Sequence, residues 1–445
     1  MFILPQGTQM TADLLSTLLA KHRALLPRYD RLRRAYEADH NILHAKQKDA
    51  CKPDNRLVAN FARYITDTMN GFFIGVPVKE THDMPAVAAY LDRLRMWNNQ
   101  DDNNAELVKT AEIYGHAFEL VYMDDDQIGV THVPPQEAFA IYDDSIVRRQ
   151  MFGVRYYTGA DGVLRGSFSD DAHITHFHDN GGIVLDEMVL HYFGAVPLHE
   201  LVLNEERKGI FEGVMTLCDA YDKAISEKAN DVDYYADAYL SVLGAELDEA
   251  TLRTLRDSRI INLSGADAEK VIVQFLQKPD ADATQEHLID RIERLIFMLS
   301  MVANINDESF GSASGVALQY KLQPMRNLAS VMERKMTALL NRRYRMIFAN
   351  PLSHMHADAW AGITYQFTRN LPANLLEESQ IAGNLSGVTS TETQLSVLSC
   401  VDNVKDEMAR KTAEAEKNAE KFTRLPRMEE SDVLDTAAGT TMAQP

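Results

Sequence analysis

Apolar side chains recur at three- and four-residue intervals over several long stretches of the chain, which is the spacing of one buried face of an α-helix. In the first of these stretches, from Gln285 onward, the repeating positions are Leu288, Ile289, Ile292, Leu295, Ile296, Leu299 and Val302. The period resumes from Val316 to Ala349 and predicts a helix of roughly 30 residues, far longer than the usual 11–12. Pro324 predicts a kink near Gln323, because proline lacks a backbone donor and clashes with the preceding turn.

A loop joins these two predicted helices. Glycine, serine, asparagine and aspartate cluster between Asn304 and Gly315, where backbone freedom and local side-chain bonding favour a connection. Another long helix is predicted from Phe211 to Ala236 and would reach about 40 Å at 1.5 Å per residue. Its opposite face is charged, so its apolar stripe must pack against the same chain or a neighbouring copy.

The first half of the chain mixes helices and short strands. Helices are predicted over Thr11–Leu26, which Pro27 ends, over Tyr29–Ala38 and over Ala105–Tyr114. A mainly antiparallel sheet is predicted from the strands Ala117–Met123, Ile128–Val133, Ala138–Tyr142, Met151–Tyr157, Val163–Phe168, His173–Phe177 and Val184–Phe193. The sequence therefore predicts an α+β fold.

A compact insert separates the long helices. Within residues 237–283 the pattern predicts the strands Tyr239–Leu243, Ile260–Leu263 and Val271–Leu276 and a helix over Glu249–Arg256. Three short strands scarcely bury a core alone, which favours pairing with neighbouring copies.

Small elements follow the longest helix. Ile363–Phe367 is predicted as a strand, and capping-box spacing at Asn374 and Thr389 predicts two short helices. A last helix is predicted from Asp402, and the chain past Pro426 is predicted to be disordered.

Charge and cysteine content narrow the function classes. The chain has 445 residues and a net charge of −20, which argues against gripping nucleic acid through phosphate neutralisation. On charge alone, an acidic surface that keeps the protein soluble is the simpler interpretation. Cys51, Cys218 and Cys400 are too far apart for a CxxC metal site. The sequence has no apolar run of about 18 residues and no basic leader, so we expect neither membrane spanning nor export.

Candidate chemistry is sparse. The sequence contains no GxxxxGK[ST], GxSxG, HExxH or dinucleotide fingerprint, so we expect no catalytic residue, no cofactor and no metal. His173, His176 and His178 resemble a ligand set, but alternate strand residues share a face, so His173 would point away from the other two. The exposed face of a strand is the favoured interpretation. Asp143 and Asp144 are likewise more typical of a solvated turn than of a magnesium site.

Basic residues cluster on one early helix, at Arg28, Arg31, Arg33 and Arg34. They are able to contact phosphate or an acidic partner, but a solvated face is the more usual role of such a run.

Several strings in a fixed order resemble one family. They include "INDESFGSASGVALQYKLQPMRNLASVMERKM", "FEGVMTLCDAYDKAISEKANDVDYYADAYLSVLGA", "NRLVANFARYITDTMNGFFIGVPV" and "HYFGAVPLHELVLNEER". Over roughly residues 28–424 the chain resembles the portal (head-to-tail connector) proteins of tailed bacteriophages, of the siphophage type.

The resemblance implies a mainly helical portal fold within the α+β class. It implies a wing with an antiparallel sheet at 1–205, a stem helix at 206–236, a small α/β clip at 237–283 and a second stem helix at 284–303. A tunnel loop follows at 304–315, and the long kinked helix with a return strand of the wing spans 316–373. A helical crown at 374–424 and a tail at 425–445 complete the chain.

The resemblance also implies a function and a set of partners. The family forms a homo-oligomeric ring, dodecameric in the virion, at one vertex of the capsid. Double-stranded DNA passes through it non-specifically during packaging and ejection. The ring docks the terminase large subunit, the scaffold and major capsid proteins and the head-completion adaptor, with no membrane partner. Assembly is expected in the host bacterial cytoplasm. The alternatives are a cytosolic helical scaffold and, less favoured, a metal-dependent hydrolase.

The resemblance places a DNA-facing tunnel loop between the second stem helix and the kinked helix. Its residues are Asn306, Asp307, Glu308, Ser309, Phe310, Gly311, Ser312, Ala313 and Ser314. Asp307 and Glu308 would repel phosphates, the small residues would allow the loop to flex, and Phe310 would offer steric contact. The alternative interpretation is an ordinary surface turn.

The kinked helix is rich in basic residues, which face either acidic residues of a neighbour or solvent. They are Lys321, Arg326, Arg334, Lys335, Arg342, Arg343 and Arg345.

Overall fold

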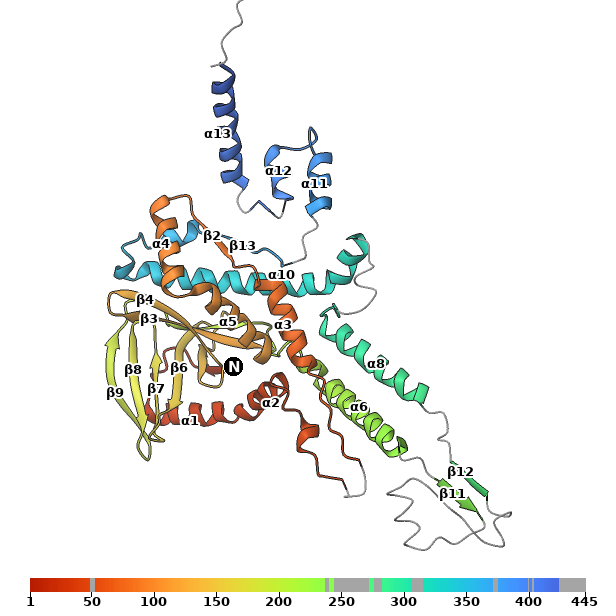
Figure 1. Ribbon diagram of the computed structural model, residues 1–445. Helices are drawn as coiled ribbons and strands as arrows, with labels where there is room; N and C mark the ends of the chain where they lie inside the picture. Colours follow the sequence, from red (N-terminus) through yellow and green to blue (C-terminus); the bar gives the residue numbers. More distant parts are fainter. Residues whose placement is uncertain are drawn as a thin grey trace, which may run out of the picture. The chain divides into compact units, whose positions relative to one another are not determined.

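The structure of the protein, a computed structural model, describes residues 1–48, 53–236, 240–243, 272–275, 282–305, 315–370, 375–398, 400–401 and 404–423. The chain divides into two compact units, Met1–Asn370 and Leu371–Pro445 (Figure 1). The first unit holds two larger sheets and the long helices, and the second holds the helices near the C-terminus.

The larger sheet has six strands in the order β1-β5-β6-β7-β8-β9. The short β1 runs parallel to β5, and the other neighbours are antiparallel. The strands are β1 (Phe2–Leu4), β5 (Ala138–Asp143), β6 (Gln150–Thr158), β7 (Leu164–Ser169), β8 (His173–Asp179) and β9 (Ile183–Leu190).

One amphipathic helix covers a face of this sheet. Helix α1 (Ala12–Arg23) begins at Thr11, whose hydroxyl accepts the Leu14 N–H at 3.3 Å and so caps the helix. Its buried residues, Leu15 among them, pack on Phe139 and Phe177 of the sheet. The period of the sequence thus matches the face that is buried.

A second sheet has the order β10-β3-β4 and is antiparallel throughout. Its strands are β10 (Leu198–Val202), β3 (His116–Asp124) and β4 (Gln127–Val133). Helix α4 (Pro85–Trp97) and the end of α10 (Gly315–Ala349) share a core with it, in which Leu91, Val121 and Phe348 are buried. Helix α5 (Gln100–Tyr114) leads directly into β3 through Gly115 in the left-handed conformation.

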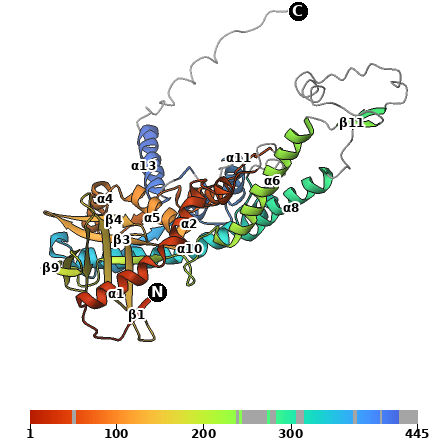
Figure 2. The same cartoon turned by 90° about the horizontal axis from the view of Figure 1, so that it is seen from below.

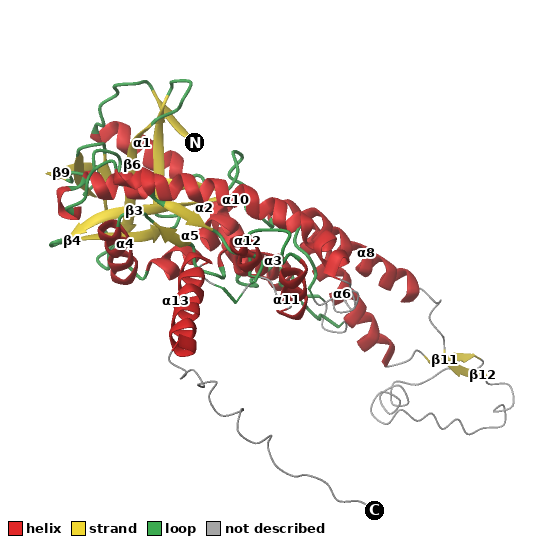
Figure 3. Cartoon of the chain, turned by 90° about the horizontal axis from the view of Figure 1, so that it is seen from above, coloured by secondary structure: helices red, strands yellow, loops and turns green. Residues whose placement is uncertain are grey.

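The other helices of the first unit are α2 (Leu26–Tyr36), α3 (Phe61–Ile74), α6 (Met215–Ala236) and α8 (Asp282–Ser300). Helices α6 and α8 lie side by side and extend away from the sheets, as two views agree (Figure 1, Figure 2). We call this pair the helical arm. Beyond it, β11 (Leu240–Leu243) pairs with β12 (Ile272–Phe275). Figure 3 shows the strands of the two larger sheets gathered at the end of this unit opposite the arm.

Smaller elements complete the description. Short 3-10 turns lie at Asn41–His44, Glu212–Val214, Pro351–Ser353 and Ala359–Gly362, and β2 (Lys79–Thr81) pairs with β13 (Thr364–Gln366). The second unit contains α11 (Leu375–Asn384), α12 (Thr391–Ser396) and α13 (Val404–Thr423).

The α+β class and most predicted elements are confirmed, with corrections at the ends. The helix predicted over Thr11–Leu26 ends at Arg23, and Pro27 lies in the first turn of α2, where a missing backbone donor costs no helical bond. The cap of α12 is Ser390, whose hydroxyl accepts the Thr393 N–H, and not Thr389.

Strands β1 and β10 and helix α4 were not predicted. Helix α10 continues unbroken through Pro324, and the kink stays a prediction. The predicted elements Glu249–Arg256 and Ile260–Leu263 lie outside the described residues.

Candidate assembly surface on the helical arm

The loop predicted to face DNA, Asn306–Ser314, lies outside the described residues. What the structure describes is its frame. Helix α8 leads toward the loop, and α10 begins directly after it at Gly315. The candidate surface is therefore built from these two helices and from α6, which packs beside α8.

The arm is held together by a narrow apolar seam and by polar bonds along its edges. Ile289, Ile292 and Ile296 are buried at successive turns of α8. Lys228 of α6 pairs with Glu286 of α8. Each of these turns of α8 thus buries one isoleucine on the same face, as expected of an amphipathic helix.

The polar face of α6 holds an extended segment of the same chain. Three side chains, each one helical turn from the last, accept backbone N–H groups from alternate residues of that segment. These bonds are Ala59 N–H to Asp222 Oδ1 (2.8 Å), Leu57 N–H to Ser226 Oγ (2.9 Å) and Asn55 N–H to Asn230 Oδ1 (2.6 Å). We call residues 53–60 the strap. The spacing between alternate N–H groups of the extended strap is close to the spacing of one helical turn along α6. Each of these N–H groups therefore lies opposite its own side-chain acceptor.

A buried histidine from outside the strap binds the other oxygen of Asp222. His40 Nδ1 lies 2.5 Å from Asp222 Oδ2, and both side chains are nearly inaccessible to solvent. Burial lowers the pKa of His40, but the hydrogen bond and charge of Asp222 outweigh it, so the net shift is upward. The charged imidazolium is therefore favoured in the fold.

Large apolar side chains remain exposed along the arm and beside the loop. Those exposed between 50% and 78% are Val232, Leu288, Met298, Leu299, Ile305 and Tyr320. Leu288 and Leu299 were predicted to belong to the buried face of α8, and this prediction is wrong for the single chain. The apolar stripe of α8 is wider than the part that α6 and α3 cover. The rest is an exposed apolar surface, which is uncommon on a helix that faces only solvent.

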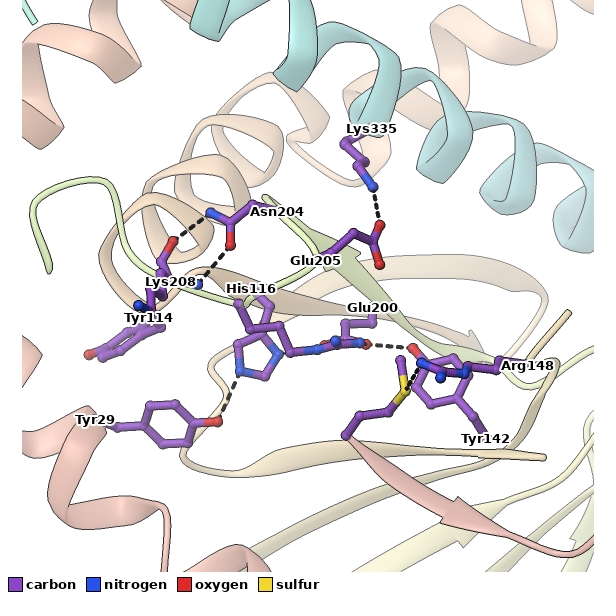
Figure 4. A network of polar contacts seen from close by, with 12 residues as sticks. Tyr29, Tyr114, His116, Tyr142, Arg148, Glu200, Asn204, Glu205, Lys208 and Lys335 are labelled. Carbon is purple, nitrogen blue, oxygen red and sulfur yellow. Dashed lines mark hydrogen bonds and ion pairs between the residues drawn. The ribbon is translucent and has the colours of Figure 1, made fainter. Parts of the chain in front are cut away.

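The basic residues of α10 do not form a single stripe. Arg343 is fully buried and makes an ion pair with Glu119 of β3, with Nε 2.8 Å from Oε1. Lys335 pairs with Glu205 at 2.7 Å (Figure 4). The prediction that these residues face a neighbouring copy or solvent is therefore wrong for Arg343, whereas Lys335 stays at the surface beside the exposed Glu205. Arg334 and Arg345 are exposed, and neither has an ion-pair partner within the described residues.

The ends of α2, β3 and β10 are joined by a buried polar network (Figure 4). Glu200 of β10 accepts bonds from His116 Nδ1 at 2.6 Å and from Arg207 Nε at 2.7 Å. Tyr29 Oη lies 2.9 Å from His116 Nε2. Burial would raise the pKa of Glu200, but the bonds and charges of Arg207 and His116 lower it below the usual value. The site is a structural junction in which each ring and charge has a partner.

The early arginines join the same junction to the arm. Arg28 Nε donates to Glu212 Oε1 at 2.9 Å, just before α6 begins. The other three also have carboxylates nearby in the same chain: Arg31 with Glu212, Arg33 with Asp30 and Glu37, and Arg34 with Asp39. This pairing favours a structural role over phosphate binding.

Most of the chain matches one protein family. The sequence model of the family described as "Phage portal protein, SPP1 Gp6-like" matches residues 15–421. The chain belongs to this portal family. The match spans β2 to β10, the arm, α10 and nearly all of the C-terminal helices in one continuous range.

Two curated relatives are named portal proteins. The portal protein of Bacillus phage SPP1 is 23% identical over 403 residues, covering 84% of this chain and 78% of the relative. The portal protein of Clostridium phage phiCD119 is 22% identical over 381 residues, covering 79% of this chain and 83% of the relative. Portal proteins of this family are structural parts of the phage particle and not enzymes, so the scaffold and hydrolase alternatives are not favoured.

Two solved structures are similar at a lower level. They are chains of the neck of an empty GTA particle computed with C6 symmetry and of a native GTA particle computed with C12 symmetry. Their TM-scores are 0.42 and 0.40, with 11% identity and coverage of 76% of this chain and 89% of each neighbour. Similarity at this level does not bear on the function of this chain.

The remaining site candidates of this portal-family chain have no ligand-binding geometry. Asp144 is exposed, but Asp143 is only 3% exposed and accepts the Ser145 and Arg149 N–H groups, so the prediction of a solvated turn is wrong for Asp143. His176 is exposed on β8, and His178 Nδ1 lies 2.9 Å from Asp186 Oδ2 on β9. Within the described residues, no three His, Cys, Asp or Glu side chains come together as a metal site. None of the helices in that part of the chain has the length and apolar character needed to cross a membrane.

The structure adds residues that the sequence interpretation missed. Phe61 and Tyr64 of α3 contact Phe297 of α8 with ring centroids 5.7 and 5.5 Å apart. Their spacing of three residues within the string "NRLVANFARYITDTMNGFFIGVPV", which fits one face of a helix, was the available signal. The acceptors Ser226 and Asn230 on α6 gave no sequence signal, because serine and asparagine are typical of a solvent-facing side of a helix.

Proposed function

We propose that the chain assembles as a closed ring at one vertex of a phage capsid and forms the channel through which double-stranded DNA enters and leaves. The observation that supports this most strongly is the row of exposed apolar residues on the arm, which includes Met298 and Leu299. When a neighbouring copy covers such a row, the burial stabilises the contact by roughly 25 cal/mol per Å² of apolar surface. A head-to-tail contact of this kind closes into a ring when the rotation between copies allows.

The elements then take the roles that the family resemblance implies. Residues 1–205, with the return segment in 316–373, are the wing, and the helices within 206–236 and 284–303 are the stem. The insert 237–283 is the clip, 374–424 is the crown and 425–445 is a tail. In the ring, the twelvefold copy number of a virion portal is the expected state.

The loop Asn306–Ser314 is proposed to face the channel. The support is its position in the sequence, between α8 and α10, and its amino-acid content. Asp307 and Glu308 repel phosphates, and none of its residues binds them as arginine does, so DNA slides past without adhering. This loop is the part of the chain that would contact the moving duplex.

The proposed partners follow from the position at the vertex. They are the terminase large subunit, the scaffold and major capsid proteins, and the head-completion adaptor, with assembly in the host cytoplasm. The exposed arginines of α10, Arg334 and Arg345, suit contacts with acidic surfaces of neighbouring copies, because the chain as a whole carries a net charge of −20.

Loop replacement tests the proposed channel function. A short glycine-serine linker in place of Asp307–Ser314 should leave rings intact and abolish packaging or retention of DNA in heads. The matched control places the same type of linker over the exposed turn at Gly159–Gly162, between β6 and β7, and should give filled heads.

The result is read from ring images and from the DNA content of heads. Filled heads from the loop variant would show that the loop is only a connection. Loss of the ring itself would show that it is a structural part of the assembly.

A further inference from the structure

The chain between α8 and the loop is fixed in place before the loop begins. Met301, directly after α8, adopts the left-handed conformation with φ 61° and turns the chain out of the helix axis. Val302 is buried with 1% exposure. Asn304 Nδ2 donates to Glu293 Oε1 of α8 at 3.2 Å. A side chain in the left-handed region is uncommon and persists only where surrounding contacts hold it.

A residue of a distant helix binds the last described peptide before the loop. The Ile305 N–H donates to Tyr64 Oη of α3 at 2.9 Å, although the two residues are 241 positions apart. The bond of Asn304 with Glu293 shapes the exit of α8 but involves no other helix. Tyr64 instead ties the start of the loop to α3.

The ring of Tyr64 is itself held by an aromatic cluster from three helices. It meets Phe297 of α8 edge-on at 5.5 Å, Phe297 meets Phe61 of α3 at 5.7 Å, and Phe61 meets Tyr221 of α6 at 4.9 Å. Edge-to-face pairs at these separations are favourable and directional. The hydroxyl of Tyr64 therefore has a position set by the packing of α3, α6 and α8 together.

We propose that Tyr64 is a positioning residue that sets where the loop Asn306–Ser314 leaves the helical arm. The aromatic cluster fixes the ring, the hydroxyl fixes the Ile305 peptide, and that peptide fixes the first point from which the loop extends. The loop then begins at a constant place in each copy of a ring, which a symmetric constriction around DNA requires. This use of the loop rests on the proposed channel function, whereas the anchor itself does not.

The anchor is tested by hydrogen exchange on the full-length chain. Tyr64→Phe removes only the hydroxyl, and the matched control is Tyr221→Phe, a tyrosine of the same cluster at the far end from the loop. In Tyr64→Phe, peptides that cover 301–305 should exchange roughly three- to tenfold faster, as expected for the loss of one hydrogen bond. The control and the rest of the arm should exchange as in the unmodified chain. Unchanged exchange at 301–305 would overturn the anchor.

The positioning role is tested by the DNA content of heads assembled with the same two variants. Rings of normal size with several-fold fewer filled heads for Tyr64→Phe, and normal filling for Tyr221→Phe, support it. Faster exchange with normal filling overturns the positioning role and leaves the channel function standing. If the unmodified chain itself forms no rings, the proposed function fails and the positioning role fails with it, while the exchange result still decides the anchor.

Discussion

Arg343 and Glu119 show how much a single buried pair can hold together in this fold. Arg343 of α10 is 0% exposed and donates to Glu119 of β3 and, at 2.7 Å, to Asn104 Oδ1 of α5. Burial would raise the pKa of Glu119, but Arg343 and His199 lower it to about 2. Three elements thus meet at one guanidinium, and removing it leaves a buried carboxylate without its counter-charge.

We predict that Arg343→Met costs about 3–5 kcal/mol of unfolding free energy, because it breaks a buried pair and leaves one partner charged. The control Arg345→Met, at an exposed position two residues on, should change stability by less than about 0.5 kcal/mol. Urea unfolding measures both. Equal effects at the two positions would contradict the assigned role of the pair.

A second residue makes stability depend on pH. His22 is buried, with Nδ1 2.8 Å from Tyr156 Oη and Nε2 2.9 Å from Pro135 O. Burial lowers the pKa of His22 from 6.5 to about 4, although the bond to Pro135 opposes this. Between these values the unfolded chain carries a proton that the folded chain lacks, so stability must fall as pH falls.

We expect the unmodified chain to lose roughly 3 kcal/mol through His22 as pH drops from above 6.5 to 4, at 1.36 kcal/mol per pKa unit. His22→Gln does not titrate, so its stability should vary less with pH over this range. Denaturant midpoints measured at several pH values give the difference between the two curves. Parallel curves would rule out a buried, neutral His22.

At the scale of elements, the strap and α6 form one unit that neither would form alone. Extended residues 53–60 have no strand partner in the described chain and use side chains of α6 as their hydrogen-bond acceptors instead. A backbone N–H group that loses its acceptor on α6 must bond water instead, and the strap then detaches from the helix more often.

Ser226→Ala should therefore cost about 1 kcal/mol and speed trypsin cleavage after Arg56, because the Leu57 N–H loses its acceptor. Thr216→Ala, at an exposed position of the same helix, should leave cleavage unchanged. Cleavage after Arg56 at the same rate in both variants would show that the strap is held by other contacts.

These elements also show what the sequence could and could not predict. The period of Ile289, Ile292 and Ile296 predicted α8 because burial on one face leaves a regular mark. Strand β10 gave no such mark, since His199 and Glu200 are buried polar residues that pair with Glu119 and His116 of β3, far away in the sequence. The Tyr64 anchor was unpredictable for the same reason, because its partner is 241 positions away.

At the scale of the whole molecule, the arm presents more apolar surface than one chain covers. Covering a leucine side chain contributes about 1.5–3 kcal/mol. We predict that Leu299→Glu weakens association between copies at least roughly tenfold while the isolated chain keeps its stability, because Leu299 is already exposed. Met96→Glu, exposed on α4 outside the arm, is the control and should assemble normally.

The most direct test of ring assembly is the native mass of the purified full-length chain at micromolar concentration over a range of salt, with images of the same sample. We predict a closed ring with a central hole and a mass that is a multiple of 50.1 kDa consistent with about twelve copies. A monomer at every salt concentration would contradict ring formation.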